Sequence, residues 1–170
     1  MFRRSHLFII ILVLCVILPT SHHAFAKSRL GSFGLELSIG GNYDLLVNDT
    51  QKSERLGLNT ELLLSYKFLI LSGDLGVLYD FRKAQAMLRP GMRLFLGWLY
   101  FRLAIPIALP LTSAKDDMFN LGILVGAGVQ IKIKKFIIVF EGNVSPFFIN
   151  INDRGLLMPA EARFGIGYYF

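Results

Sequence analysis

The sequence predicts an all-β fold, an eight-stranded antiparallel up-and-down transmembrane β-barrel that follows a cleavable signal peptide. Its last ten residues alternate strictly between apolar residues and charged or small ones, the pattern of a strand between hydrocarbon and a polar interior. Similar segments recur along the chain, separated by turn residues. Beyond the leader no apolar run approaches the roughly 20 residues of a membrane-spanning helix, although 54% of the residues are hydrophobic. Alternating strands are therefore expected to form the wall.

The first 26 residues have the pattern of a secretory signal peptide. Arg3 and Arg4 precede the apolar run 7–18, and the small-x-small segment 24–26 is a cleavage site. The apolar run is about twelve residues long, too short to cross a bilayer as a helix, which takes roughly 20. We therefore assign 1–26 to the signal peptide.

Cleavage at this site leaves one domain, 27–170, the predicted outer-membrane β-barrel domain. Every histidine and the single cysteine fall in the leader, so the mature chain has neither disulfide nor histidine chemistry. Its charges are scattered along the sequence rather than clustered. This distribution argues against nucleic acid as a partner.

The eight strands are predicted from alternating segments of about ten residues. They span residues 32–41, 55–67, 69–81, 86–96, 99–108, 118–132, 136–148 and 161–170. In the first four, the outward positions are Phe33, Leu35, Leu37 and Ile39; Leu56, Leu58, Thr60, Leu62, Leu64 and Tyr66; Leu69, Leu71, Leu75, Val77, Tyr79 and Phe81; and Leu88, Met92, Leu94 and Leu96.

The last four strands continue the pattern. Their outward positions are Leu99, Phe101, Leu103, Ile105 and Ile107; Phe119, Leu121, Ile123, Val125, Val129 and Ile131; Ile138, Phe140, Val144 and Phe148; and Ala162, Phe164, Ile166, Tyr168 and Phe170. With these phases, every charged residue within the strands falls on the inward face. A soluble lipocalin-like barrel would show the reverse arrangement.

An even strand number places both termini on one side, which we expect to be periplasmic. The extracellular loops are then 42–54, 82–85, 110–117 and 149–157. Three prolines, Pro90, Pro106 and Pro146, fall toward the extracellular rim. Because proline cannot donate a ladder hydrogen bond, we predict β-bulges at these positions.

Aromatic residues gather near the predicted strand ends, as the girdles of a membrane barrel do. They are Phe33, Tyr43, Tyr66, Phe68, Tyr79, Phe81, Phe95, Trp98, Tyr100, Phe101, Phe119, Phe136, Phe147, Phe148, Tyr168, Tyr169 and Phe170.

Eight inward charged residues are expected at overlapping heights near the middle of the barrel. They are the acids Glu36, Glu61, Asp74 and Glu141 and the arginines Arg89, Arg93, Arg102 and Arg163. Charges removed from bulk water must be paired, and an eight-stranded barrel is barely wide enough for its own side chains. The sequence thus predicts a plugged lumen with an interior charge network. This network either simply satisfies the interior or rearranges to gate a narrow conductance.

Enzymatic, metal and cofactor sites are not predicted. Small outer-membrane barrel enzymes commonly use histidine beside serine or aspartate, and the mature chain has no histidine. Two groups of oxygen ligands could hold Ca²⁺, but neither forms a defined metal loop. These groups are Asn150, Asn152 and Asp153, and Asp44, Asn48 and Asp49.

The last strand, with Phe164, Ile166, Tyr168 and Phe170 on its apolar face, resembles the closing strand of bacterial outer-membrane β-barrels. In that family the C-terminal aromatic signature is recognised by the barrel assembly machinery. The predicted mature chain as a whole resembles small barrels of the OmpA/OmpX type in strand count, terminal Phe170 and polar plug. It departs from OmpA in ending at Phe170 without a peptidoglycan-binding domain. The resemblance implies a Gram-negative outer membrane, with its lipid and assembly machinery as partners.

Two functions are compatible with these features. The first is a non-enzymatic integral outer-membrane protein with a structural or surface-interaction role through short extracellular loops. The second is a narrow or gated pore or transporter for small or hydrophobic solutes. The surface ligand is not indicated by the sequence.

Overall fold

The structure, a computed structural model, describes residues 31–47, 56–109, 120–147 and 156–170, within the unit Gly31–Phe170. The predicted signal peptide lies outside the described residues. Within them, no helix has the length and apolarity needed to cross a membrane.

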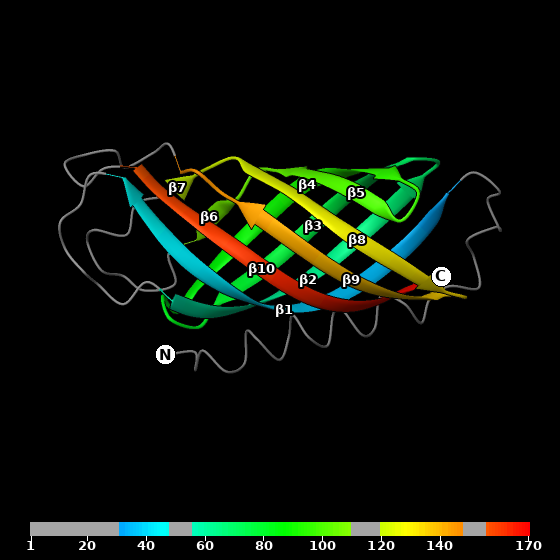
Figure 1. The fold of residues 1–170 in the computed structure, drawn as a ribbon, viewed down its shortest axis with the longest axis horizontal. Helices are drawn as coiled ribbons and strands as arrows, with labels where there is room; N and C mark the ends of the chain where they lie inside the picture. The colour runs from blue at the N-terminus through cyan, green and yellow to red at the C-terminus, as the bar shows by residue number, and fades with distance from the viewer. Residues whose placement is uncertain (1–30, 48–55, 110–119, 148–155) are drawn as a thin grey trace, which may run out of the picture. The chain divides into compact units, whose positions relative to one another are not determined.

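The described residues form an antiparallel all-β barrel (Figure 1). Its strands are β1 (Ser32–Val47), β2 (Leu56–Phe68), β3 (Leu71–Asp80), β4 (Gln85–Leu96), β5 (Leu99–Ala104), β6 (Ile107–Leu109), β7 (Asn120–Leu121), β8 (Leu124–Ile133), β9 (Phe136–Val144) and β10 (Leu156–Tyr169). The short strands β6 and β7 continue the lines of β5 and β8, respectively. The described wall therefore has eight strand lines, which confirms the predicted fold class.

Each strand line pairs with its neighbours in the sequence, including β3 with β4, and the pairing of β1 with β10 completes the ring. Short turns join β2 to β3, β4 to β5 and β8 to β9, with positive φ at Leu69, Gly97 and Lys134. We name this the turn end of the barrel and the opposite end, where Val47, Leu56 and Gln85 lie, the loop end.

Inward and outward residues alternate along the wall as the sequence predicts. On β1, Leu37 and Ile39 are 54% and 59% exposed on the outer face, whereas Glu36 and Ser38 between them are buried. The phase of 136–148, the least regular predicted segment, also agrees, because Glu141 is buried and Phe140 is half exposed. A single register error would have inverted these faces.

Two strands extend further toward the loop end than predicted. The predicted loop 42–54 begins inside β1, which runs to Val47, and the predicted strand 161–170 begins inside β10, which runs from Leu156 to Tyr169. These extensions pair with each other through Tyr43↔Ala160 and Val47↔Leu156. Polar residues such as Asn42 suggest a loop in sequence, but here Asn42 belongs to a strand whose inner face is polar.

The prediction of β-bulges at the prolines is wrong. Residue pairing keeps the same register across Pro106, from Gly91↔Ala104 to Leu88↔Ile107, so no extra residue is inserted. Instead, the ladder lacks one backbone hydrogen bond at each proline. Pro106, between β5 and β6, is an example.

The residue pairs that lack this second hydrogen bond form a row across four neighbouring strand interfaces. The carbonyls of Pro90, Pro106, Pro146 and Pro159 accept bonds from the N–H groups of Ile105, Gly122, Ile123 and Ser145 at 2.9–3.0 Å. In an antiparallel ladder such a pair exchanges two bonds, but proline has no N–H to return the second. Because Ile105 adjoins Pro106, Gly122 adjoins Ile123 and Ser145 adjoins Pro146, we term this continuous set of pairs the proline row.

The predicted aromatic girdle holds for the outward rings only. Pairs such as Phe33 and Tyr66, with ring centroids 4.7 Å apart, and Tyr168 and Phe170, 5.3 Å apart, include exposed rings on the wall. The remaining aromatics, all buried, point into the barrel; they are Phe95, Tyr100, Phe147 and Tyr169. Phe119 and Phe148 lie outside the described residues.

Candidate functional site

All eight predicted network residues point into the barrel and are buried, from 0% exposure at Arg89 and Arg93 to 7% at Asp74 and Glu141. Alternation places them there, because each occupies a position between two outward-facing residues of its strand. They come from β1, β2, β3, β4, β5, β9 and β10. The structure brings them together in two connected groups.

Glu61 of β2 is the centre of the larger group. Its carboxylate accepts hydrogen bonds from both terminal nitrogens of Arg102, at 2.8 Å to Oε1 and 3.0 Å to Oε2. It also accepts a bond from Arg163 Nη1. Two guanidinium groups from β5 and β10 thus share one carboxylate, an arrangement that the planar arginine fork favours.

From Glu61 the larger group extends in two directions across the lumen. Arg102 also donates to Glu141 at 2.9 Å, and that carboxylate accepts from Tyr100 and Asn143 at 2.7 and 2.8 Å. In the other direction, Arg163 donates to Glu161. Both carboxylates therefore have several charge-assisted partners.

Glu161 is the acid that the sequence prediction omitted. It accepts bonds from Arg163 and from both terminal nitrogens of Arg89, at 2.9 and 2.6 Å. Glu161 is the first residue of the predicted last strand, on its charged or small face, and was not among the acids expected near the middle of the barrel. Its spacing of two residues from Arg163 was the available signal, since residues two apart share one face of a strand.

The smaller group surrounds Arg93 of β4. Arg93 Nη1 lies 2.9 Å from Glu36 Oε2, and Arg93 Nε lies 2.7 Å from Asp74 Oδ2. Ser72 donates a further bond to Asp74 at 2.8 Å. The Arg93 guanidinium also stands 5.4 Å from the Tyr100 ring, within the range of a cation–π contact.

Two apolar clusters also occupy the interior. One contains Phe95, Tyr100, Ile137, Val139 and Tyr169 and lies toward the turn end, where Lys67 Nζ stands 3.6 Å from the Phe95 ring centroid. The other contains Leu78, Met87, Ala108 and Phe147 and lies toward the loop end. The charged groups thus lie between two sets of apolar side chains.

At the loop-end rim, a third charged group is built around the turn between β3 and β4. Asp80 accepts bonds from the backbone N–H groups of Arg82 and Lys83, at 2.9 and 3.0 Å, and from the Asn42 amide at 2.8 Å. The side chains of Arg82 and Lys83 both pair with Asp44. The other predicted oxygen ligands near Asp44, at 48 and 49, lie outside the described residues, as do those at 150, 152 and 153.

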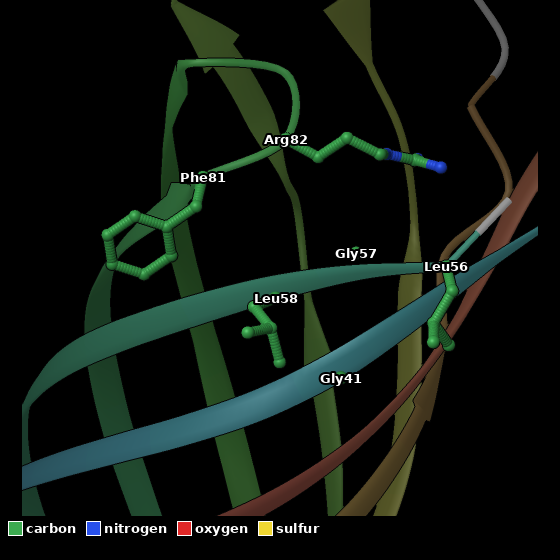
Figure 2. Close-up of a pocket in the computed structure, with 6 residues that line it drawn as sticks. All are labelled: Gly41, Leu56, Gly57, Leu58, Phe81 and Arg82. Atoms are coloured by element: carbon green, nitrogen blue, oxygen red, sulfur yellow. The ribbon is translucent and has the colours of Figure 1, made fainter. Parts of the chain in front are cut away.

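An open groove of about 420 Å³ lies beside this turn. Figure 2 shows its lining, in which the Arg82 side chain runs above β2 toward Leu56 while Phe81 points the opposite way. Gly41, Gly57 and Leu58 complete the lining. The groove was not predicted from the sequence, because its lining residues meet only when β1, β2 and the turn are placed side by side.

The residues proposed as a C-terminal assembly signal lie along the outer face of β10. Phe164, Ile166 and Phe170 are 44%, 57% and 44% exposed. Phe164 packs against Phe140 of β9, with ring centroids 5.1 Å apart. The strand is paired on both sides, with β1 and β9.

Chemically, the described lumen holds a network of buried ion pairs. The described network joins four guanidinium groups to five carboxylates, and each arginine contacts at least one acid. The described residues contain no cluster of three or more side chains suited to holding a metal ion. The arrangement can hold strands together across the lumen and can block it.

Comparisons with known proteins agree with the architecture. No protein-family model matches the chain, and no curated protein matches it. The crystal structure of Neisserial surface protein A (NspA) is similar at 14% identity and a TM-score of 0.55, covering 82% of this chain and 99% of that one. The crystal structure of Ail, the attachment invasion locus protein of Yersinia pestis, in complex with the heparin analogue sucrose octasulfate, is similar at 14% identity and a TM-score of 0.51, covering 84% and 100%. The chain thus has the fold of the small eight-stranded outer-membrane barrels.

Proposed function

We propose that this chain, with the fold of small outer-membrane barrels, is a non-enzymatic integral outer-membrane protein with a plugged lumen. Its role is structural or one of surface interaction through the short connections at the loop end. The observation that carries the proposal is the polarity of the wall, which is the reverse of that in a soluble barrel. Apolar side chains face outward and buried ion pairs fill the interior.

Insertion in a membrane is supported by the outer face of the described strands. Leu37, Ile39, Leu58, Phe101 and Ile166 are each more than half exposed, a contiguous apolar wall that water would not tolerate on a soluble monomer. The charged side chains of these strands all take inward positions. Such a distribution matches a lipid solvent outside and a polar interior.

A closed lumen is supported by the layered interior. The charged groups span the barrel from β4 to β10 and from β5 to β2 through Arg89–Glu161 and Arg102–Glu61. Apolar clusters lie on either side of them. Opening a continuous path would require breaking several buried charge-assisted bonds at once.

The targeting features complete the proposal. Residues 1–26 act as a signal peptide, and the outer face of β10, ending in Phe170, is the surface that the assembly machinery recognises. The turn end then faces the periplasm and the loop end faces outward. The short connections at the loop end, including the Asp80-centred turn, are the parts available to a surface partner.

Three measurements test the proposal on the refolded mature chain. We expect faster migration of the unheated than of the heated protein in gel electrophoresis, a requirement for detergent to remain in solution, and no steady conductance in planar bilayers. Solubility without detergent would refute membrane insertion. Steady conductance would refute the plug and favour the narrow pore.

A second recording separates a static plug from a gate. Arg93→Ala and Arg163→Ala remove one guanidinium from the smaller and the larger charged group, respectively. Unchanged closure in both variants, with unchanged heat-modifiable migration, fits a structural network. Voltage-dependent opening in either variant would instead assign a gating role to the ion pairs.

A further inference from the structure

At the turn end, the last inward position of every second strand line holds either a lysine or an aromatic ring. These positions are Lys67 of β2, Phe95 of β4, Lys132 of β8 and Tyr169 of β10. In the ring of strand lines β1-β2-β3-β4-β5-β8-β9-β10, β2 and β8 lie on opposite sides. The two lysines therefore face each other across the opening of the barrel, which we call the turn-end mouth.

Both lysine side chains contact aromatic rings rather than acids. Lys67 Nζ lies 3.6 Å from the Phe95 ring centroid, and Lys132 Nζ lies 5.5 Å from that of Tyr169. Phe95 and Tyr169 belong to the same buried cluster, which forms the floor of the mouth. The charged groups that act on Lys67 are Lys132 and Arg93, both positive. Within the described parts of the chain, neither lysine forms an ion pair with an acidic group.

Aspartate and glutamate do not occur in the described segments at this end of the barrel. These segments are 31–35, 66–73, 94–100, 129–137 and 166–170. Deeper in the lumen, the acids Glu36 and Asp74 are both bound to Arg93. At the loop end, in contrast, the rim cations of the β3–β4 turn pair with Asp44. The lysines of the turn-end mouth are thus available to an anion from solution.

The position of the two lysines suits an anion that bears two charges. An eight-stranded barrel is barely wide enough for its own side chains, so ammonium groups on opposite strand lines approach and repel each other. A single dianion between them replaces this repulsion with two attractions. A phosphate dianion has one charge for each lysine and oxygen atoms to which both ammonium groups can donate hydrogen bonds.

We propose that the turn-end mouth binds one dianionic phosphate group, held between Lys67 Nζ and Lys132 Nζ above Phe95 and Tyr169. The group belongs to inorganic phosphate or a phosphate monoester that enters from the turn end. A lipid phosphodiester shares the phosphate chemistry but has only one negative charge, and its acyl chains keep it outside the wall. This site goes beyond the proposed function, because it does not depend on which side of the membrane the turn end faces.

Nuclear magnetic resonance of the refolded, isotopically labelled mature chain in maltoside micelles tests the site. Inorganic phosphate is titrated at about pH 8, where it is dianionic, with the ionic strength held constant by sodium chloride. We expect saturable shifts of backbone amides at the strand ends that carry Lys67 and Lys132. Dimethyl phosphate, a monoanionic substitute for a lipid phosphodiester, should bind about tenfold or more weakly.

Three variants locate the bound phosphate. Lys67→Gln and Lys132→Gln each remove one of the two charges, and each should weaken phosphate binding about tenfold. The matched control is Lys135→Gln, which removes the same charge from the turn between β8 and β9. Because Lys135 Nζ lies 5.6 Å from the ring of the outward Tyr168, its loss should change the affinity by less than about twofold. Heat-modifiable migration is recorded for every variant.

Three results would overturn the proposal. The first is a wild type without saturable shifts at the turn end. The second is an equal loss of affinity in Lys132→Gln and Lys135→Gln, which would indicate only a general attraction to a positive surface. The third is dimethyl phosphate binding as tightly as phosphate, which would assign the mouth to a lipid phosphodiester. A chain that never becomes heat-modifiable refutes the barrel on which both proposals rest, whereas a folded barrel without phosphate binding refutes only this inference.

Discussion

The inner and outer faces of the same strands follow different rules. Glu61 and Leu62 are adjacent on β2, yet Glu61 makes specific bonds to two arginines from distant strands while Leu62 belongs to the apolar wall. On the inner face, a side chain is fixed by partners across the lumen. On the outer face it needs only to be apolar. Substitutions should therefore be judged by face before they are judged by residue type.

The sharpest test of this contrast is Glu61→Gln. It removes the charge shared by Arg102 and Arg163, two guanidinium groups that are 2% and 6% exposed. We expect the free energy of unfolding to fall by about 3 kcal/mol or more, because buried cations lose a paired carboxylate. Urea unfolding in lipid vesicles measures the change. The outward neighbour Leu62→Met should change it by less than about 1.5 kcal/mol, and equal losses would contradict the contrast.

The complementary test places a charge on the outer face. Leu37→Arg, near the middle of β1, should cost about 2–4 kcal/mol if the wall faces hydrocarbon. The same urea titration gives the value, with Leu37→Val as the uncharged control. If Leu37→Arg were as stable as the control, the wall would not be in contact with lipid.

Glycines offer a smaller, matched comparison. A Cβ at the inward Gly128 would meet Tyr100 ring atoms at 2.5 Å and the Phe140 carbonyl at 2.6 Å, whereas one at the outward Gly142 would meet nothing closer than 4.0 Å. Gly128→Ala should therefore lose about 1–3 kcal/mol of unfolding free energy through overpacking. Gly142→Ala should lose none. Similar values for the two variants would show that the interior can relax around a methyl group.

The smallest expected effect concerns a contact on the outer face alone. A double-mutant cycle with Phe140→Leu and Phe164→Leu isolates the coupling of rings whose centroids lie 5.1 Å apart. We expect about 0.5–1.5 kcal/mol, the usual range for aromatic pairs. A coupling as large as the loss from Glu61→Gln would remove the distinction between the faces.

Strand faces were predictable from the sequence because alternation has a period of two and depends on local residues only. Arg89, Arg93, Arg102 and Arg163 could thus be placed inside from their neighbours. Which acid each arginine meets could not be predicted. Arg89 and Glu161 are 72 residues apart and Arg163 and Glu61 are 102 apart, so their contact depends on how the closed wall staggers its strands.

Strand ends and interior aromatics were predicted less well, for a common reason. Asn42 and Glu161 resemble loop or rim residues in a sequence, and Phe95 and Tyr100 resemble girdle residues. The interior of this barrel accepts both classes, because polar groups find partners there and aromatic rings fill the turn-end cluster. Local residue type therefore could not distinguish a strand end from a strand that continues inside a polar lumen.

The proline row gives one part of the wall a different mechanical character. Each pair in the row keeps a single backbone hydrogen bond, so the ladder is weaker along this line than on either side of it. Local opening begins where backbone bonding is sparse. We therefore expect the stretch of wall beyond the row, including β6 and β7, to open locally before the part of the barrel that the buried ion pairs hold together.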